Sequence, residues 1–170
     1  KLLESLLPSG GTKYQLFAEG RTMFMDAGYA AIGMDHFALP TDELTQAMNE
    51  RRLHRNFMGY TTVPASEMIG FGVSSIGEVG GAYAQNEKRL VKYYRMVDEG
   101  MMPTVHGMFL SEDDEVRRWL IRQLMCNFYV DTAVLQERFG VDYDTYFASE
   151  EELLKDFYDE GFIAREDGNL

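Results

Sequence analysis

The chain has 170 residues, of which 45% are hydrophobic, and it carries a formal net charge of -12. This length and apolar content are enough for one sizeable core or two small ones, and they exclude a wholly disordered chain. The charge, with a pI near 4.6, argues against binding to a nucleic-acid backbone or to an anionic membrane surface.

The cysteine content and the hydropathy pattern predict a cytoplasmic protein. Cys126 is the single cysteine and therefore cannot form an internal disulfide. No run approaches the roughly 20 apolar residues that a membrane span needs. Glu4 and Pro8 interrupt the first apolar residues too early for a signal peptide. Because the chain begins with Lys1 rather than methionine, we expect a fragment of a longer protein.

The first third of the chain is predicted to alternate helix and strand. A capping-box pattern and apolar residues at helical spacing predict a helix over residues 12–27, which Gly28 should end. Residues 29–33 form a short apolar run of strand length, and the helix-then-strand order is that of an α/β barrel. A second helix, capped by the Thr41 hydroxyl, is predicted over residues 40–52.

Residues 57–81 are β-prone, rich in small side chains and nearly uncharged. The glycines of residues 70–72 and 77–81 match neither the dinucleotide-binding fingerprint nor a Walker loop. Small residues there could let a strand bend or pack tightly, or could let an adenine or ribose lie against the main chain. The sequence leaves both interpretations open.

The remainder is predicted to be mainly helical, with a domain boundary between residues 105 and 106. Before the boundary, Asn86 should cap a helix that ends at Gly100, and residues 104–110 should form a strand or crossover. After it, three helices are predicted over residues 111–124, 132–139 and 150–158, and Ser111-x-x-Asp114 should cap the first of them. A strand over residues 162–165 and a type I′ hairpin turn at residues 167–168 should follow. Three helices followed by a hairpin is a winged-helix pattern, and the chain ends before the return strand of the hairpin.

The residues that most often bind metals are dispersed along the chain. His36, His54 and His106 are far apart, and the sequence contains no HxxxH, CxxC or Cys-His pairing. We therefore predict no metal site and no catalytic residue in this chain. His106 and Cys126 are expected to have structural roles.

Two polar clusters lie among apolar residues: GMDHFALP at residues 33–40 and LHRNFMGYTT at residues 53–62. Each places titratable groups beside aromatic side chains. A tetrapyrrole with carboxylate arms needs both, because arginine and histidine can hold propionates while aromatic and methionine side chains cover the ring. The alternative is that each cluster is a charged turn after a strand.

Those clusters, together with GVSSI at residues 72–76, YAQN at 83–86 and LMCNF at 124–128, closely resemble the oxygen-independent coproporphyrinogen III oxidases. The resemblance covers essentially all 170 residues, with the motifs in order and at consistent spacing. It implies an α+β fragment in which residues 1–105 complete a radical-SAM partial (β/α) barrel and the substrate cleft. Residues 106–170 would form a mostly helical, winged-helix-like carboxy-terminal domain that is truncated in its wing.

The resemblance further implies an enzyme that binds a 4Fe-4S cluster through a CxxxCxxC motif and cleaves S-adenosylmethionine reductively. The resulting deoxyadenosyl radical takes a hydrogen from a propionate, and loss of carbon dioxide and an electron leaves a vinyl group. Two such reactions convert coproporphyrinogen III to protoporphyrinogen IX in haem biosynthesis, and family members bind two S-adenosylmethionine molecules. Because Cys126 stands alone, the cluster ligands are absent from this chain, which should be inactive by itself.

One cofactor contact carries over from the family to this chain. Ile76 ends the segment that matches the family's Gly-Val-Ser-Ala-Ile strand, so it should contact S-adenosylmethionine through apolar packing and main-chain groups. His54, Arg55 and Tyr60 are candidates for the substrate cleft.

Some positions depart from the family pattern. Met58 stands where a glutamine is expected, Ser75 where an alanine is expected, and residues 63–66 replace a more polar stretch. These differences bear on substrate contacts more than on the resemblance itself. The expected partners are coproporphyrinogen III and an electron donor, and we expect a monomer.

A non-catalytic haem or porphyrin carrier, related to the radical-SAM haem chaperones, is the alternative function. The oxidase-type motifs speak against it. A winged-helix nucleic-acid binder would need basic residues on its last helix and wing, whereas residues 150–160 are predominantly acidic and would repel phosphate.

Overall fold

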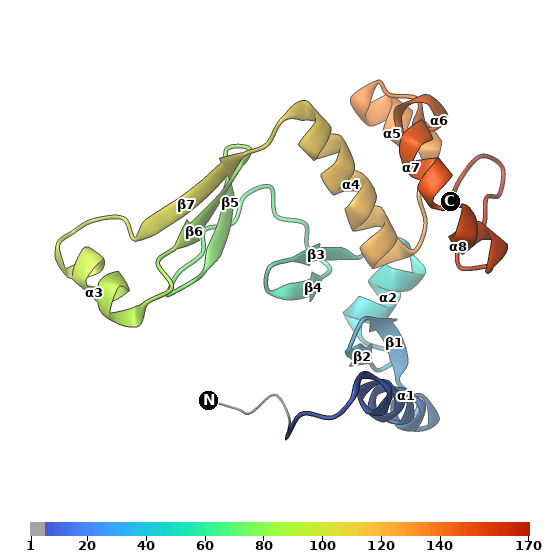
Figure 1. Cartoon of the computed structure of the whole chain (residues 1–170), viewed down its shortest axis with the longest axis horizontal. Coiled ribbons are helices and arrows are strands. Elements are labelled where there is room, and N and C mark those ends of the chain that lie inside the picture. Colours follow the sequence, from blue (N-terminus) through green and yellow to red (C-terminus); the bar gives the residue numbers. More distant parts are fainter. Residues whose placement is uncertain (1–5) are drawn as a thin grey trace. The chain divides into compact units, whose positions relative to one another are not determined.

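The computed structural model describes residues 6–170, and the chain divides into two compact units after Leu53. The first five residues, which entered the signal-peptide interpretation, lie outside the described residues. Helices and short antiparallel strands occur in both units, so the predicted α+β class is confirmed (Figure 1). No helix in the described part combines the length and apolar character that crossing a membrane requires.

The first unit contains α1 (Gly10–Asp26), β1 (Ala30–Gly33), β2 (His36–Ala38) and α2 (Glu43–Asn49). The strands form an antiparallel hairpin, which confirms the strand predicted over residues 29–33. Both predicted helices are present. The capping residues differ from those predicted. Short polar side chains one to three residues from the predicted positions accept hydrogen bonds from the free amide groups at the helix starts.

At the start of α1, the Ser9 hydroxyl accepts a hydrogen bond from the Thr12 amide at 3.2 Å, so the predicted capping box at Thr12 is wrong. At the start of α2, the Asp42 carboxylate rather than the Thr41 hydroxyl caps the helix by accepting from the Leu44 amide at 2.8 Å. An acid at this position also interacts favourably with the positive end of the helix dipole.

The second unit contains β3 to β7 and α3 to α8. Their bounds are β3 (His54–Asn56), β4 (Gly59–Thr61), β5 (Ile76–Val79), β6 (Ala82–Asn86), α3 (Leu90–Asp98), β7 (Thr104–Phe109), α4 (Glu112–Asn127), α5 (Thr132–Phe139), α6 (Tyr143–Tyr146), α7 (Ala148–Leu153) and α8 (Lys155–Asp159). The helices predicted over residues 111–124 and 132–139 are confirmed as α4 and α5. The single helix predicted over residues 150–158 is wrong, because two short helices, α7 and α8, meet at Leu154.

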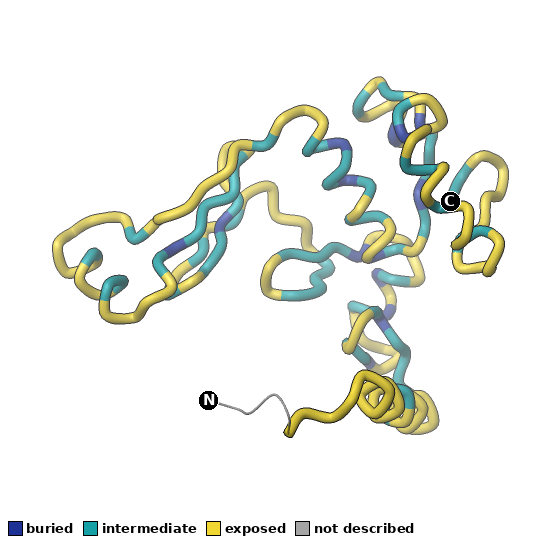
Figure 2. Tube along the Cα trace, viewed as in Figure 1, coloured by how far each residue is buried: buried dark blue, intermediate teal, exposed yellow. Residues whose placement is uncertain are grey.

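The central sheet of this unit has the order β5-β6-β7, with both pairs antiparallel. Gly80 and Gly81, with φ of 58° and 71°, form the tight turn between β5 and β6, a conformation that glycine adopts without a steric penalty. The predicted strand over residues 104–110 is confirmed as β7, which is exposed along its length (Figure 2). The predicted domain boundary between residues 105 and 106 falls inside β7, and the domain division stays a prediction.

Asn86 does not cap a helix. It is 8% exposed, and its side-chain amide donates to the carbonyl oxygens of Gly70 at 3.2 Å and Gly72 at 3.0 Å. Helix α3 begins after Arg89, which makes no side-chain capping hydrogen bond. The prediction was wrong because this asparagine satisfies the backbone of a distant loop instead of the helix that follows it.

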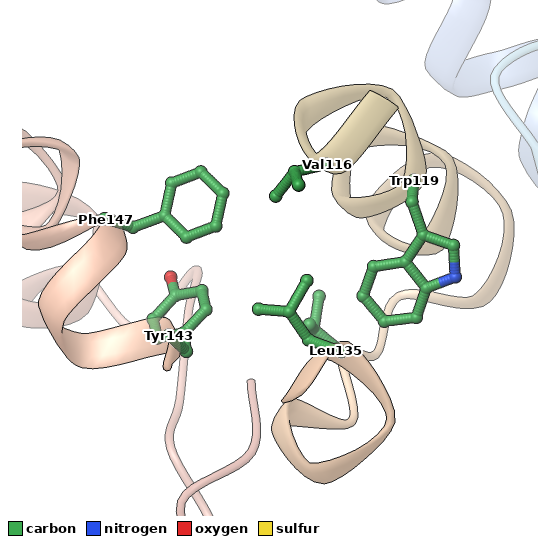
Figure 3. Close-up of a cluster of buried hydrophobic side chains, with 6 residues drawn as sticks. Val116, Trp119, Leu135, Tyr143 and Phe147 are labelled. Carbon is green, nitrogen blue, oxygen red and sulfur yellow. The ribbon is translucent and has the colours of Figure 1, made fainter. Parts of the chain in front are cut away.

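Helix α4 begins with the predicted capping box, in which the Ser111 hydroxyl accepts from the Asp114 amide and the Asp114 carboxylate accepts from the Ser111 amide. One face of α4 packs into the core of the carboxy-terminal helices (Figure 3). This core is formed by buried side chains from α4, α5, α6 and their connections: Val116, Trp119, Val130, Leu135, Tyr143 and Phe147.

The predicted hairpin turn is confirmed. Asp167 and Gly168 both have positive φ, and Glu166 and Asn169 exchange backbone hydrogen bonds of 3.0 and 2.9 Å. The predicted strand over residues 162–165 is wrong. The strand-like pairing lies elsewhere, because Leu170 exchanges backbone hydrogen bonds with Val130 at 2.7 and 3.1 Å.

Candidate functional site

A groove of about 640 Å³ lies in the second unit and is lined by residues of helix α4, the β3–β4 hairpin and the central sheet. Small-molecule sites commonly have volumes of about 300–1,000 Å³. The lining is mainly apolar and includes several arginines: Arg55, Asn56, Phe57, Glu78, Tyr83, Met108, Leu110, Asp114, Arg117, Arg118, Ile121, Arg122, Met125 and Cys126.

Helix α4 supplies one wall of the groove. Arg118, Arg122 and Cys126 are spaced four residues apart, so they lie along one face of the helix. Val116 and Trp119 of the same helix are buried in the helical core. The same helix therefore anchors the carboxy-terminal helices and presents basic side chains to the groove.

The β3–β4 hairpin supplies a second wall. Arg55 pairs in register with Tyr60, and the Arg55 guanidinium lies 5.0 Å from the centre of the Tyr60 ring. The Tyr60 hydroxyl donates to the carbonyl oxygen of Met125 at 3.1 Å, which joins the hairpin to α4. Asn56 fixes the turn by accepting from the Met58 amide at 2.8 Å.

Positive charge is left uncompensated where these walls meet. The Nη1 atom of Arg55 is buried and has no hydrogen-bond partner within the described structure. Arg122 lines both the groove and a neighbouring cavity of about 40 Å³. Across residues 6–170, no ion pair includes either arginine.

The carboxylates near the groove are already engaged. Glu78 pairs with Arg118, and Asp114 accepts the capping hydrogen bonds from Ser111. Neither forms an ion pair with Arg55 or Arg122. A site with two unpaired guanidinium groups and few free carboxylates is suited to an anion.

Two titratable neighbours of these arginines are held in their neutral forms. Burial, followed by the positive charge of Arg122, lowers the pKa of His54 below 6.5. Burial raises the pKa of the Cys126 thiol, and Arg122 and Arg55 oppose this effect only in part. Since a buried neutral thiol is a poor nucleophile, Cys126 fits its predicted structural role.

The structure brings three of the four predicted site residues together. His54, Arg55 and Tyr60 lie on the β3–β4 hairpin, although Tyr60 lines neither cavity. Ile76 begins β5, where it pairs with Gln85 and is half-buried, and it lines neither of these cavities.

Arg122 was missed in the sequence. The signal that could have found it is the helical spacing that places it with Arg118 and Cys126 on one face of α4. The sequence could not show that Arg55, more than sixty positions earlier, lies against that face.

The glycines of residues 70–81 have structural explanations. A Cβ atom on Gly70 would lie 2.9 Å from the Ile76 carbonyl oxygen, and one on Gly77 would lie 2.9 Å from the Met68 carbonyl oxygen. Tight packing of backbone on backbone is therefore the reason for small residues at these positions.

The other polar cluster, residues 33–40, lies in the first unit. Asp35 lies in the β1–β2 hairpin turn and His36 begins β2, and the carboxylate of Asp35 is 2.9 Å from Nδ1 of His36. This geometry fits the charged-turn interpretation. Among the described residues, no three histidine, cysteine or acidic side chains are grouped so that they could hold a metal ion.

The chain is similar to a family of known proteins. Residues 110–170 match the model of a family described as the HemN C-terminal domain. Oxygen-independent coproporphyrinogen III oxidases of Salmonella typhimurium and Escherichia coli are each 40% identical over 163 residues, which are 96% of this chain and 36% of theirs. The enzyme of Thermostichus vulcanus is 41% identical over 158 residues, which are 92% of this chain and 49% of its own.

A solved structure gives the same result. It is described as the coproporphyrinogen III oxidase HemN from Escherichia coli, a radical SAM enzyme. It matches 99% of this chain and 39% of its own chain, with a TM-score of 0.92 and 38% identity. The chain thus spans a little over a third of the length of most of the relatives described here.

In sequence and in structure, the chain is therefore similar to the carboxy-terminal part of a radical SAM enzyme. More narrowly, the resemblance to the oxygen-independent coproporphyrinogen III oxidases is confirmed over almost the whole chain.

Proposed function

We propose that this chain is the carboxy-terminal part of an oxygen-independent coproporphyrinogen III oxidase. The whole enzyme would decarboxylate two propionates of coproporphyrinogen III oxidatively to vinyl groups, giving protoporphyrinogen IX for haem biosynthesis. The observation that carries this proposal is 40% identity over 96% of the chain to oxidases of this name, together with the TM-score of 0.92. The proposal includes a cytoplasmic monomer that receives electrons from a separate donor.

The proposed enzyme needs S-adenosylmethionine, two molecules in this family, and a 4Fe-4S cluster. When bound, these groups supply the radical that removes hydrogen from the substrate. The chain's own residues do not fit the cluster, because its single cysteine, Cys126, is buried and protonated at neutral pH. The cluster would therefore be held by the part of the enzyme that this chain does not span.

Ile76 is the proposed contact of this chain with S-adenosylmethionine. Its side chain is half-buried at the start of β5, which leaves apolar surface for packing against a ligand. Two residues further along β5, Glu78 exchanges backbone hydrogen bonds of 2.7 Å with Met68. The position of Ile76 is thus fixed by the sheet rather than by a mobile loop.

The groove beside α4 is the proposed substrate side of the chain. Apolar side chains such as Phe57, Met108 and Ile121 could cover a tetrapyrrole ring, while Arg55 supplies positive charge for a carboxylate arm. His54 and Tyr60 would position Arg55 from the same hairpin.

In the whole enzyme, residues 1–105 would complete a partial (β/α) barrel and residues 106–170 would form a winged-helix-like helical domain. Helix α1 supports the first part of this proposal. It buries no residue within the described structure, and several of its large apolar side chains are exposed, including Leu16, Met23 and Phe24. Such a helix is expected to pack against further protein.

The experiment that tests this function uses the full-length enzyme, with its cluster reconstituted in the absence of oxygen. Coproporphyrinogen III, S-adenosylmethionine and a reductant are added, and both products are measured. We expect protoporphyrinogen IX to form together with deoxyadenosine. An intact cluster with haem bound and no decarboxylation would overturn the proposal in favour of a haem or porphyrin carrier.

A further inference from the structure

We propose that Arg55 and Arg122 together form a carboxylate-binding site that anchors one propionate arm of the tetrapyrrole. This inference rests on the proposed function for the identity of the ligand, whereas the anion site itself rests on the geometry of the groove. The arm held here is one that the reaction leaves intact.

The first support is the placement of the two guanidinium groups. Arg55, on β3, and Arg122, on α4, line the same groove and the same small cavity beside it. Both lie close enough to Cys126 to act on its thiol electrostatically. Two elements far apart in the sequence therefore direct positive charge to one place.

The second support is the unpaired Nη1 atom of Arg55. A buried N–H group without a partner costs free energy, and the cost is larger when the group is charged. The Arg55 guanidinium is held in place by the ring of Tyr60, whose hydroxyl is itself bound to α4. A fixed guanidinium with a free donor is preorganised for an oxygen anion.

The third support is the charge of the surroundings. The chain as a whole has a net charge of -12, yet the carboxylates that line these cavities, Glu78 and Asp114, are engaged by Arg118 and Ser111. His54 lines the small cavity in its neutral form, so the positive charge there comes from the arginines. The two cavities are lined by four arginines, Arg55, Arg117, Arg118 and Arg122, and by only two carboxylates, so their lining keeps a net positive charge for a bound carboxylate.

The shape of the groove favours a propionate as the source of that carboxylate. Phe57, Met108 and Ile121 line the space next to the arginines, so an apolar ring and an anionic arm could be bound together. S-Adenosylmethionine also carries a carboxylate and is the competing source.

The chemistry favours an arm that is retained. Ion pairs with two arginines stabilise the carboxylate anion, whereas decarboxylation removes that anion as neutral carbon dioxide. Strong ground-state pairing would therefore oppose the reaction at this arm. At an anchored arm no bond is formed or broken, and the ion pairs serve to orient the ring.

The first test measures KM and kcat of the full-length enzyme with Arg55→Gln and Arg122→Gln. We expect each variant to raise KM for coproporphyrinogen III at least about tenfold, with little change in KM for S-adenosylmethionine. Arg95→Gln is the matched control, because it changes the net charge equally at an exposed position of α3 outside both cavities. A raised KM for S-adenosylmethionine alone would assign the carboxylate to the cofactor and overturn the propionate proposal.

The second test measures binding without turnover. Fluorescent coproporphyrin III is titrated with the full-length protein, and its tetra-amide is titrated as the uncharged analogue. We expect the wild-type protein to prefer the tetracarboxylate and Arg55→Gln to lose that preference, while Arg55→Lys keeps part of it because the charge remains without the planar fork. Equal binding of both porphyrins to the wild type and the variants would overturn the inference.

The two tests separate this inference from the proposed function. An enzyme that binds coproporphyrin III through Arg55 without converting the reduced substrate would contradict the oxidase proposal and support the site. An active enzyme whose kinetics and binding are unchanged by both glutamine variants would support the oxidase proposal and overturn the site.

Discussion

The guanidinium of Arg118 on α4 donates a hydrogen bond to the carboxylate of Glu78 on β5, forty positions earlier in the chain. Both side chains are mostly covered, at 23% and 20% exposed. Arg118 also donates to Glu115 on its own helix, and it lies 6.0 Å from the centre of the Tyr83 ring. This pair therefore joins the central sheet to the helix that forms the opposite wall of the groove.

Replacing Arg118 with methionine should destabilise the second unit by about 1–3 kcal/mol, because Glu78 would stay half-buried without its partner. The measurement is the free energy of unfolding in urea, followed by the fluorescence of Trp119, the single tryptophan of the chain. The double variant Arg118→Met with Glu78→Gln should lose less than the sum of the two single variants. Additive losses would show that the pair does not couple the sheet to α4.

Replacing Gly77 with alanine should destabilise the sheet by about 1–3 kcal/mol, because the added Cβ would lie 2.9 Å from the Met68 carbonyl oxygen and the backbone must shift. Thermal unfolding followed by circular dichroism measures the effect. Gly20→Ala is the control, since a Cβ there meets no atom within 4 Å and alanine favours the helix. An unchanged melting temperature for Gly77→Ala would contradict the close-packing explanation of this glycine.

The elements that could be predicted from the sequence are those set by local interactions. The capping box of Ser111 and Asp114 predicted the start of α4, and Asp167 with Gly168 predicted the hairpin turn. In both cases the side chains act within three residues of one another, so the pattern of residue types is sufficient.

The features that could not be predicted depend on long-range contacts. The Asn86 side chain donates hydrogen bonds to a loop that lies 14 and 16 positions earlier. Near the end of the chain, Leu170 pairs with Val130, whereas residues 162–165 form no strand. The candidate site behaves in the same way. Its candidates His54, Arg55 and Tyr60 were predicted from one cluster of residues, but Arg122 joined them only when the fold placed α4 alongside.

Acidification should destabilise the second unit through His54. Its pKa is lowered in the folded state, so as the pH falls through 6.5 the unfolded chain takes up a proton more readily than the folded chain does. Stability is therefore lost as the pH falls through 6.5, the value expected for an exposed histidine. We expect His54→Gln to reduce this loss, measured as the unfolding free energy reported by Trp119. His106→Gln, on the exposed strand β7, should keep the wild-type pH dependence.

Substitution of Ile76 should weaken the binding of S-adenosylmethionine rather than the binding of the tetrapyrrole. In the full-length enzyme, Ile76→Asp is expected to raise KM for S-adenosylmethionine at least about tenfold, because a charge would enter an apolar contact. Ile76→Val should change it by less than about threefold. Val79→Asp places the same charge on the same strand at a position that is 43% exposed, so it controls for damage to the sheet. Equal effects of the two aspartate variants would argue against a cofactor contact at Ile76.

Leu135 lies at the centre of the helical core and is fully buried, with side chains from α4 and α6 around it (Figure 3). Truncation to alanine removes apolar contacts and leaves a cavity, so the free energy of unfolding should fall by about 2–5 kcal/mol. Urea unfolding followed by Trp119 fluorescence reports this directly, because the indole belongs to the same cluster. Leu153→Ala, at a position that is 78% exposed, should change the stability by less than about 0.5 kcal/mol.

Because α4 carries both this core and Arg122, Leu135→Ala should also weaken coproporphyrin III binding under conditions in which the variant is partly unfolded. Weakened binding by a fully folded variant would show instead that the core sets the geometry of the groove.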